Sequence, residues 1–119
     1  MKDYLQFIKN DGIILVCFLI EEDKVLEIGD KMNEISEDAY MNGYNWEAFI
    51  HYYLKNHHPE ILENMETDSE AGTYVAYYTD TPENEKKAEK LAAIIEELVE
   101  NEARLYEIVR NEGSDINWE

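Results

Sequence analysis

The chain has 119 residues, enough for one domain with its own hydrophobic core, and its single cysteine excludes an intramolecular disulfide. It carries 28 Asp and Glu against 10 Lys and Arg, a net charge of -18, so direct nucleic-acid binding is excluded for lack of a basic patch. The longest apolar run, residues 13–20, is too short to cross a membrane, and the N-terminus lacks signal-peptide features, so we expect a cytoplasmic protein.

Two apolar segments near the N-terminus predict a β-hairpin. Residues 4–9 and 13–20 flank Asn10-Asp11-Gly12, where we expect a three-residue loop with Gly12 in the left-handed conformation. Residues 13–20 are apolar without interruption, as in a central strand covered on both faces or in a short buried helix. The hairpin signal and the β-branched residues favour the strand. Cys17 lies in this run, which predicts a buried thiol.

The next segment has the spacing of a helix, with Asp23 as its expected cap. Its apolar residues follow the helical period: Val25, Ile28, Met32 and Ile35. Gly29 interrupts the pattern, so a strand over residues 24–28 is the alternative.

A central segment, residues 42–54, predicts the helix that anchors the core. Asn42-Gly43 is a turn signal that tolerates positive φ, Asn45 is the expected N-cap, and Glu47 is expected in the first turn. The apolar residues form one helical face: Trp46, Phe49, Ile50, Tyr53 and Leu54.

His57-His58-Pro59 is expected to end this helix, with Pro59 in the first turn of another. Residues 66–72 predict a polar loop, and residues 73–78 predict a strand. In that strand Val75 and Tyr77 share one face, while Tyr74, Ala76 and Tyr78 share the other.

Thr81-Pro82-Glu83 has the cap, proline and carboxylate of a helix start. An apolar stripe continues to Val109, and its interruption at Asn101 is compatible with one bent helix or two successive ones. Gly113 is expected to end it, leaving residues 113–119 as a candidate flexible tail. These elements predict a single α+β domain, in which a small, mostly antiparallel sheet of the N-terminal hairpin plus a later strand packs against the central and C-terminal helices.

Catalytic and metal-binding motifs are missing from the sequence, so we expect neither enzymatic activity nor a cofactor. Glu47, His51 and Lys55 follow one another at intervals of four on one helical face. The Glu47–His51 pair leaves a small metal-dependent enzyme or sensor as an alternative, but no HExxH motif or second His/Cys cluster supports it.

The acidic residues are unevenly distributed. Residues 32–81 contain ten Asp and Glu but only Lys55 as a cation, a net charge of -9. This region also holds many of the nine tyrosines, a residue type that binds through an apolar ring with a polar tip. We expect about half of them in the core, such as Tyr53, Tyr74 and Tyr77, and others at the surface: Tyr40, Tyr44, Tyr52 and Tyr78. Aromatic anchors in an acidic surface suit a basic protein partner.

Two segments carry a family resemblance. Asn42-Gly43-Tyr44-Asn45-Trp46-Glu47 and Asp68-Ser69-Glu70-Ala71-Gly72 resemble segments of the Imm51 family of bacterial immunity proteins, and the resemblance extends from the hairpin to about Val109. It implies an α+β protein without enzymatic activity that binds and blocks a cognate toxin of a polymorphic toxin system. The resemblance does not imply which toxin, and an acidic scaffold for another basic protein is the alternative.

Within these segments we expect Gly43, Trp46, Ala71 and Gly72 to serve the fold. Polar residues on and near them, together with Tyr78, are the partner-binding candidates: Tyr44, Glu47, Glu63, Glu66, Asp68, Glu70 and Tyr78. We hypothesise a basic, nuclease-type toxin whose cationic cleft is covered by these carboxylates. The oligomeric state has no sequence signal.

Overall fold

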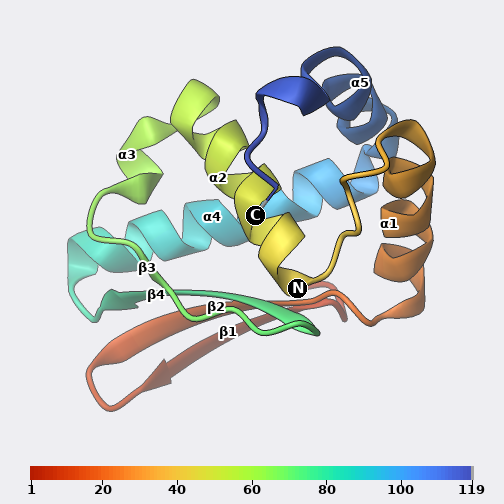
Figure 1. Ribbon diagram of the computed structural model, residues 1–119. Helices are drawn as coiled ribbons and strands as arrows, with labels where there is room; N and C mark the ends of the chain where they lie inside the picture. The colour runs from red at the N-terminus through yellow and green to blue at the C-terminus, as the bar shows by residue number, and fades with distance from the viewer. Residues whose placement is uncertain (119) are drawn as a thin grey trace.

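The computed structural model describes residues 1–118, and its helices lie on one side of an antiparallel sheet (Figure 1). The elements are β1 (Leu5–Asn10), β2 (Ile13–Leu19), α1 (Asp23–Ile35), α2 (Gly43–His57), α3 (Pro59–Leu62), β3 (Glu66–Thr67), β4 (Thr73–Thr79), α4 (Pro82–Glu100), α5 (Glu102–Glu112) and a 3-10 helix, η1 (Gly113–Asp115). The predicted α+β architecture is confirmed.

The sheet has the strand order β1-β2-β4-β3, and every neighbouring pair is antiparallel. Asn10 pairs with Ile13, so the β1–β2 loop has two residues, and the expected three-residue loop was wrong. Asp11 and Gly12 both have positive φ, 50° and 79°, because a two-residue hairpin turn needs left-handed backbone at both positions to match the twist of the strands. Gly12 has the predicted left-handed conformation.

Only one face of the sheet is covered by helices (Figure 1). The inner face presents Ile14, Val16 and Phe18 of β2 beside Tyr74, Ala76 and Tyr78 of β4, all almost completely buried. On the outer face Ile13, Leu15 and Leu19 are only half-buried. The prediction of a central strand was therefore confirmed, but within the described chain helices cover one of its faces and not the expected two. Cys17 is buried as predicted, which raises the pKa of its thiol.

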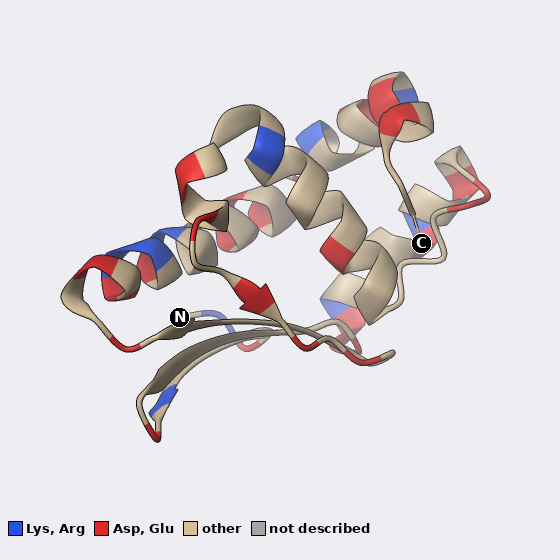
Figure 2. Ribbon diagram, turned by 60° about the vertical axis from the view of Figure 1, so that its left-hand side comes forward, with Lys and Arg blue, Asp and Glu red and all other residues tan. Residues whose placement is uncertain are grey.

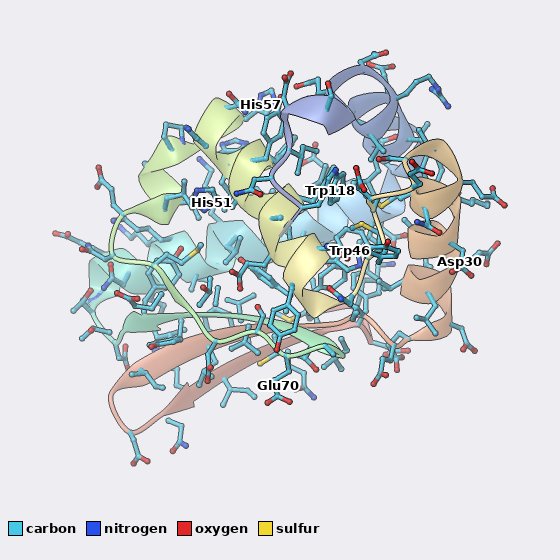
Figure 3. All side chains as sticks on the ribbon, in the orientation of Figure 1. Asp30, Trp46, His51, His57, Glu70 and Trp118 are labelled. Carbon is cyan, nitrogen blue, oxygen red and sulfur yellow. The ribbon has the colours of Figure 1, made fainter. Side chains whose placement is uncertain are left out.

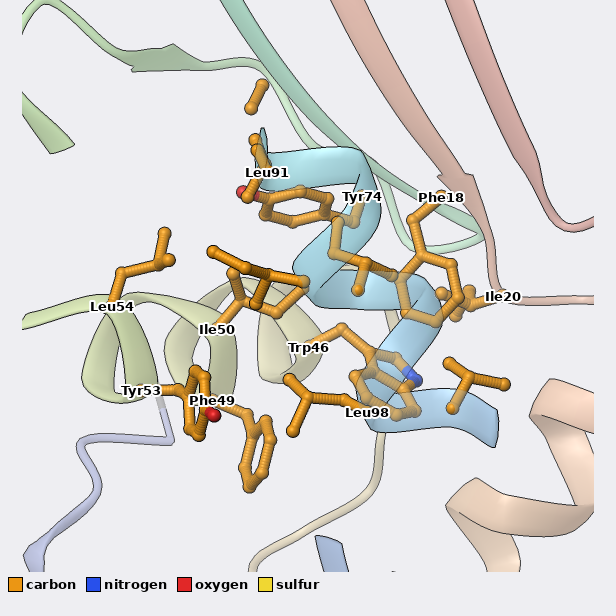
Figure 4. Close-up of a cluster of buried hydrophobic side chains, with 14 of the residues drawn as sticks. Phe18, Ile20, Trp46, Phe49, Ile50, Tyr53, Leu54, Tyr74, Leu91 and Leu98 are labelled. Atoms are coloured by element: carbon orange, nitrogen blue, oxygen red, sulfur yellow. The ribbon is translucent and has the colours of Figure 1, made fainter. Parts of the chain in front are cut away.

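Helix α2 supplies the aromatic centre of the core, as predicted (Figure 4). Trp46 is 1% exposed and packs edge-on against Phe18 of β2, with ring centroids 4.9 Å apart. The other predicted core residues of this helix are also buried: Phe49, Ile50, Tyr53 and Leu54. Since full burial of a large apolar side chain contributes about 1.5–3 kcal/mol, this face of α2 holds the helix on the sheet.

The starts of α1 and α2 differ from their predictions. Glu22, not Asp23, precedes α1, and its side chain makes no capping hydrogen bond. Asn42, not Asn45, caps α2: its Oδ1 accepts from the Asn45 amide at 2.9 Å, and Asn45 Oδ1 accepts from the Asn42 amide. The helix therefore begins three residues earlier than predicted, and Glu47 lies beyond its first turn.

Gly29 is compatible with α1 because the loop before α2 packs directly on it. A Cβ atom at position 29 would lie 3.0 Å from the Met41 Cβ, so the helix and the loop approach closely at this point. Helix α1 therefore contains all four predicted apolar positions, and the strand alternative over residues 24–28 was wrong.

In the C-terminal half the predicted helix start is confirmed, and the apolar stripe is divided between two helices. Thr81 Oγ1 accepts from the Asn84 amide at 3.1 Å, with Pro82 at the first helical position. Asn101 separates α4 from α5, so there are two successive helices, and α5 ends immediately before Gly113.

Residues 113–118, part of the candidate flexible tail, pack against α2. Ile116 and Trp118 are buried, and the Trp118 ring stacks on Phe49 with centroids 6.4 Å apart. Asn45 Nδ2 donates to the Trp118 carbonyl oxygen at 2.6 Å, and Trp118 Nε1 donates to the Gly113 carbonyl oxygen at 3.1 Å. These contacts tie the end of the described chain to the start of α2.

Candidate partner-binding surface

The two segments that carry the family resemblance touch each other. The Gly43 amide at the start of α2 donates to the Ala71 carbonyl oxygen at 2.7 Å. A Cβ atom at position 43 would lie 1.8 Å from the Glu70 carbonyl oxygen, so glycine permits this close approach. Positive φ occurs one position before the Asn42-Gly43 pair, at Met41, which corrects the expected role of the pair.

The expected loop over residues 66–72 is an extension of the sheet. Glu66 and Thr67 form β3, which pairs with Tyr77 and Ala76 of β4. Beyond β3, the Asp68 amide donates to the Val75 carbonyl oxygen at 3.0 Å, and Glu70 bridges Thr73. The segment is therefore a hairpin arm along the edge of the sheet. Its residues are polar, so strand propensity did not reveal it.

Three predicted acids lie along this edge. Glu66 stands opposite Tyr77, Asp68 opposite Val75, and Glu70 opposite Thr73. All three acids are exposed, and none forms an ion pair with another residue between 1 and 118. Figure 2 shows these acidic positions along β3 and the following loop, and Figure 3 shows Glu70 below the start of α2. We call Glu66, Asp68 and Glu70 the acidic edge.

A hollow of about 380 Å³ separates α2 from β3. Tyr44 and Glu47, both predicted site residues, line it together with Thr67 of β3, and His51 and Lys55 line it further along α2. Tyr44 is 52% exposed and also borders a second hollow of about 550 Å³ that reaches Tyr40. Tyr44 and Glu47 thus face Thr67 of β3 across this hollow, whereas the neighbouring Glu66 shares the outer face of the sheet with Tyr77.

Two tyrosines of the first hollow have raised pKa values. The Tyr52 hydroxyl donates to Glu112 Oε1 at 2.6 Å, and this hydrogen bond raises the pKa of Tyr52 to about 12. Burial, with smaller contributions from Tyr78 and Glu47, raises the pKa of Tyr74 far above its usual range. The Tyr74 hydroxyl makes no hydrogen bond to any residue from 1 to 118. Both phenols are thus neutral at physiological pH.

Two other predicted site residues do not join this surface. Glu63 lies after α3, and its carboxylate is 3.7 Å from the Lys87 ammonium of α4, so its charge is partly balanced. Tyr78 is 1% exposed and its hydroxyl donates to the Ile61 carbonyl oxygen at 2.6 Å. Its expected exposure was wrong, because strand alternation places Tyr78 on the inner face with Tyr74.

Sequence reasoning missed the contribution of the C-terminal segment. Asp115 and Asn117 line the first hollow, because Trp118 anchors this segment in the core. A tryptophan within a polar stretch was the signal that could have indicated this anchoring. The sequence analysis also predicted Tyr77 in the core, but Tyr77 is half-buried on the outer face of the sheet.

Among the described residues, the Glu47–His51 pair has no further metal ligands beside it. Between residues 1 and 118, no three His, Cys, Asp or Glu side chains are grouped closely enough to hold a metal ion. Among the same residues, every helix is too short or too polar to cross a bilayer.

Comparison with known proteins identifies one family. Residues 5–114 match the family model described as immunity protein 51, Imm51, so the match includes the acidic edge and the start of α2. No curated protein and no solved structure matches the chain. Since the match covers nearly the whole chain, the chain belongs to the Imm51 family of immunity proteins.

Proposed function

We propose that this immunity protein neutralises a basic cognate toxin by stoichiometric binding through the acidic edge and the adjacent Tyr44 and Glu47. The observation that carries the proposal is the absence of ion pairs at Glu66, Asp68 and Glu70 within the described chain. Lysines elsewhere are engaged: Lys9 with Glu85, Lys24 with Glu100, Lys87 with Glu63, and Lys90 with Glu60. The acidic edge therefore keeps its negative potential for a partner.

Electrostatics and aromatic contact have different roles in this proposal. A group of exposed carboxylates without neighbouring cations attracts a basic partner over a distance and accelerates its association. Exposed aromatic rings provide the short-range contact, because they bury apolar area with little loss of side-chain entropy. Tyr44 is 52% exposed and Tyr40 75% exposed, and both line the second hollow.

We further propose that the toxin is a nuclease. A nuclease holds the phosphates of its substrate in a cationic cleft, and a row of carboxylates offers such a cleft the same sign of charge. The three acids of the edge alternate along an extended chain, so carboxylates follow one another at about 6.6 Å, two residues of strand rise. The inhibitor would thus occupy the substrate cleft and need no catalysis of its own.

Isothermal titration of the purified protein with the toxin domain encoded by the adjacent gene tests this function. We expect saturable binding with one inhibitor per toxin, and toxin activity that falls to zero at that ratio. Raising the salt concentration from about 50 to 200 mM should weaken the complex, because screening shortens the reach of the acidic edge. No heat and no loss of toxin activity would overturn the immunity function for this toxin, and binding unaffected by salt would overturn the electrostatic part.

A further inference from the structure

The outer face of the sheet is apolar although no helix covers it (Figure 1). The strand register places twelve residues on this face: three of β1, four of β2, four of β4 and one of β3. Ile8, Leu15, Val75 and Tyr77 form its centre, and Ile8 is 41% exposed. In an antiparallel sheet with one face in solvent, apolar and polar residues usually alternate along each strand. The apolar residues on the outer face here are instead typical of a sheet that is covered on both faces. We call these twelve residues the open sheet face.

Charge is depleted on the open sheet face. Charged residues make up 32% of the chain, yet Glu66 at the border is the one charged residue among the twelve. Lys9, the one Lys or Arg in the four strands, stands opposite Ile14 of the inner face and is bound to Glu85. An apolar centre depleted of charge, with a charged border, is the composition of a protein interface core and its rim.

The border of this face is the acidic edge. Glu66, Asp68 and Glu70 stand opposite Tyr77, Val75 and Thr73, which belong to the open sheet face. A hollow of about 430 Å³ lies at this border and is lined by Ile13, Glu66 and Tyr77. A cationic side chain that enters it would meet the Glu66 carboxylate and the Tyr77 ring together.

From these observations we infer that the open sheet face is the apolar centre of the toxin-binding interface, and that its occupant is a toxin surface with an apolar centre and a basic border. This inference rests on the proposed function. A second copy of the chain fits less well, because it has a net charge of -18 and offers no cation on its own open sheet face to meet the acidic edge. A basic partner neutralises that edge while it covers the apolar centre.

The test replaces apolar residues at the centre of the open sheet face with residues that favour β-strand conformation. The variant Ile8→Thr, Leu15→Thr, Val75→Thr has β-branched side chains, which favour strands, at three outward positions and removes apolar contact area. We expect its affinity for the toxin domain to fall at least about 100-fold, since three central contacts each contribute several-fold or more. Leu26→Gln is the matched control, because Leu26 is 45% exposed on α1, away from the sheet, and its affinity should stay within about twofold.

Each outcome decides the inference. Circular dichroism shows whether the triple variant is folded. If it is not, Val75→Thr alone is used, because threonine has nearly the same shape as valine. We expect this single variant to bind the toxin domain about fivefold more weakly. Unchanged affinity of a folded variant would overturn the inference while the immunity function stands. Absence of binding by the wild-type protein would overturn the proposed function itself. Concentration-dependent dimers of the free protein that the triple variant abolishes would overturn the inference in favour of a second copy.

Discussion

Gly43 at the start of α2 donates its amide hydrogen to the Ala71 carbonyl oxygen across 2.7 Å. This hydrogen bond joins the two segments that characterise the family in this chain, and it holds the helix start against the hairpin arm that carries the acidic edge. The positions of Tyr44 and Glu47 relative to Glu70 therefore depend on a residue without a side chain.

The first prediction concerns Gly43→Ala. Its Cβ atom would lie 1.8 Å from the Glu70 carbonyl oxygen and 2.8 Å from that of Thr73. Because both neighbours are backbone atoms, we expect the free energy of unfolding, measured by urea denaturation, to fall by about 3 kcal/mol. Gly12→Ala is the control: apart from its chain neighbours, no atom of residues 1–118 lies within 4 Å of the added Cβ, and the positive φ alone should cost about 1 kcal/mol. Equal losses in the two variants would contradict the close approach.

The second prediction concerns the packing of the C-terminal segment. Trp118 is 7% exposed and stacks on Phe49, so Trp118→Ala should lower the free energy of unfolding by about 3 kcal/mol. The neighbouring Asn117 is exposed, and Asn117→Ala should change it by less than about 0.5 kcal/mol. A flexible tail would leave both variants as stable as the wild-type protein.

The third prediction concerns pH. The pKa of Tyr52 is about 12 in the folded protein, because its hydroxyl donates to Glu112, and about 10 in the unfolded chain. A raised pKa means that the folded state favours the neutral phenol, so this stabilisation is complete below pH 10 and is lost as the pH rises toward 12. We expect tyrosinate absorbance to show one phenol fewer titrating near pH 12 in Tyr52→Phe.

The matched variant for this pair is Glu112→Gln. Removing the carboxylate should move the titration of Tyr52 back toward pH 10 without changing the number of phenols. If Glu112→Gln leaves the tyrosinate titration curve unchanged, the hydrogen bond does not determine the pKa of Tyr52.

Helical spacing and capping signals were sufficient to predict most helices. Trp46, Phe49 and Leu54 are buried as their period indicates, and Thr81 caps α4 as predicted. The cap of α2 was assigned to Asn45 instead of Asn42. Both asparagines belong to one reciprocal capping box, in which each side-chain oxygen accepts from the other's backbone amide, and a linear pattern does not show which of them precedes the helix.

The sheet was harder to predict, because contacts with distant residues define it. The strand β3 has two polar residues, and only its pairing with Tyr77 and Ala76 makes it a strand. The apolar run of β2 indicated cover on both faces, whereas helices cover only one. If a partner covers the other face, the sequence pattern describes the complex and not the free protein.

The candidate site was predicted in part for the same reason. The helix start that carries Tyr44 lies against the loop that carries Glu70 because Gly43 contacts Ala71, a pairing that the family resemblance could suggest but spacing could not. Tyr78 was placed at the surface by its acidic neighbours in sequence, although strand alternation with Tyr74 and Ala76 already indicated the inner face.

The association rate with the toxin domain tests the acidic surface most directly, in two variants that each remove three negative charges. Glu66→Gln, Asp68→Asn, Glu70→Gln neutralises the acidic edge; Glu89→Gln, Glu97→Gln, Glu107→Gln neutralises exposed acids of α4 and α5 that form no ion pair among the described residues. At about 50 mM salt we expect the first variant to associate at least about tenfold more slowly, with a flatter salt dependence, and the second to stay within about threefold of the wild-type rate. Equal slowing in both variants would show that net charge alone steers the toxin and would contradict a binding surface at the acidic edge.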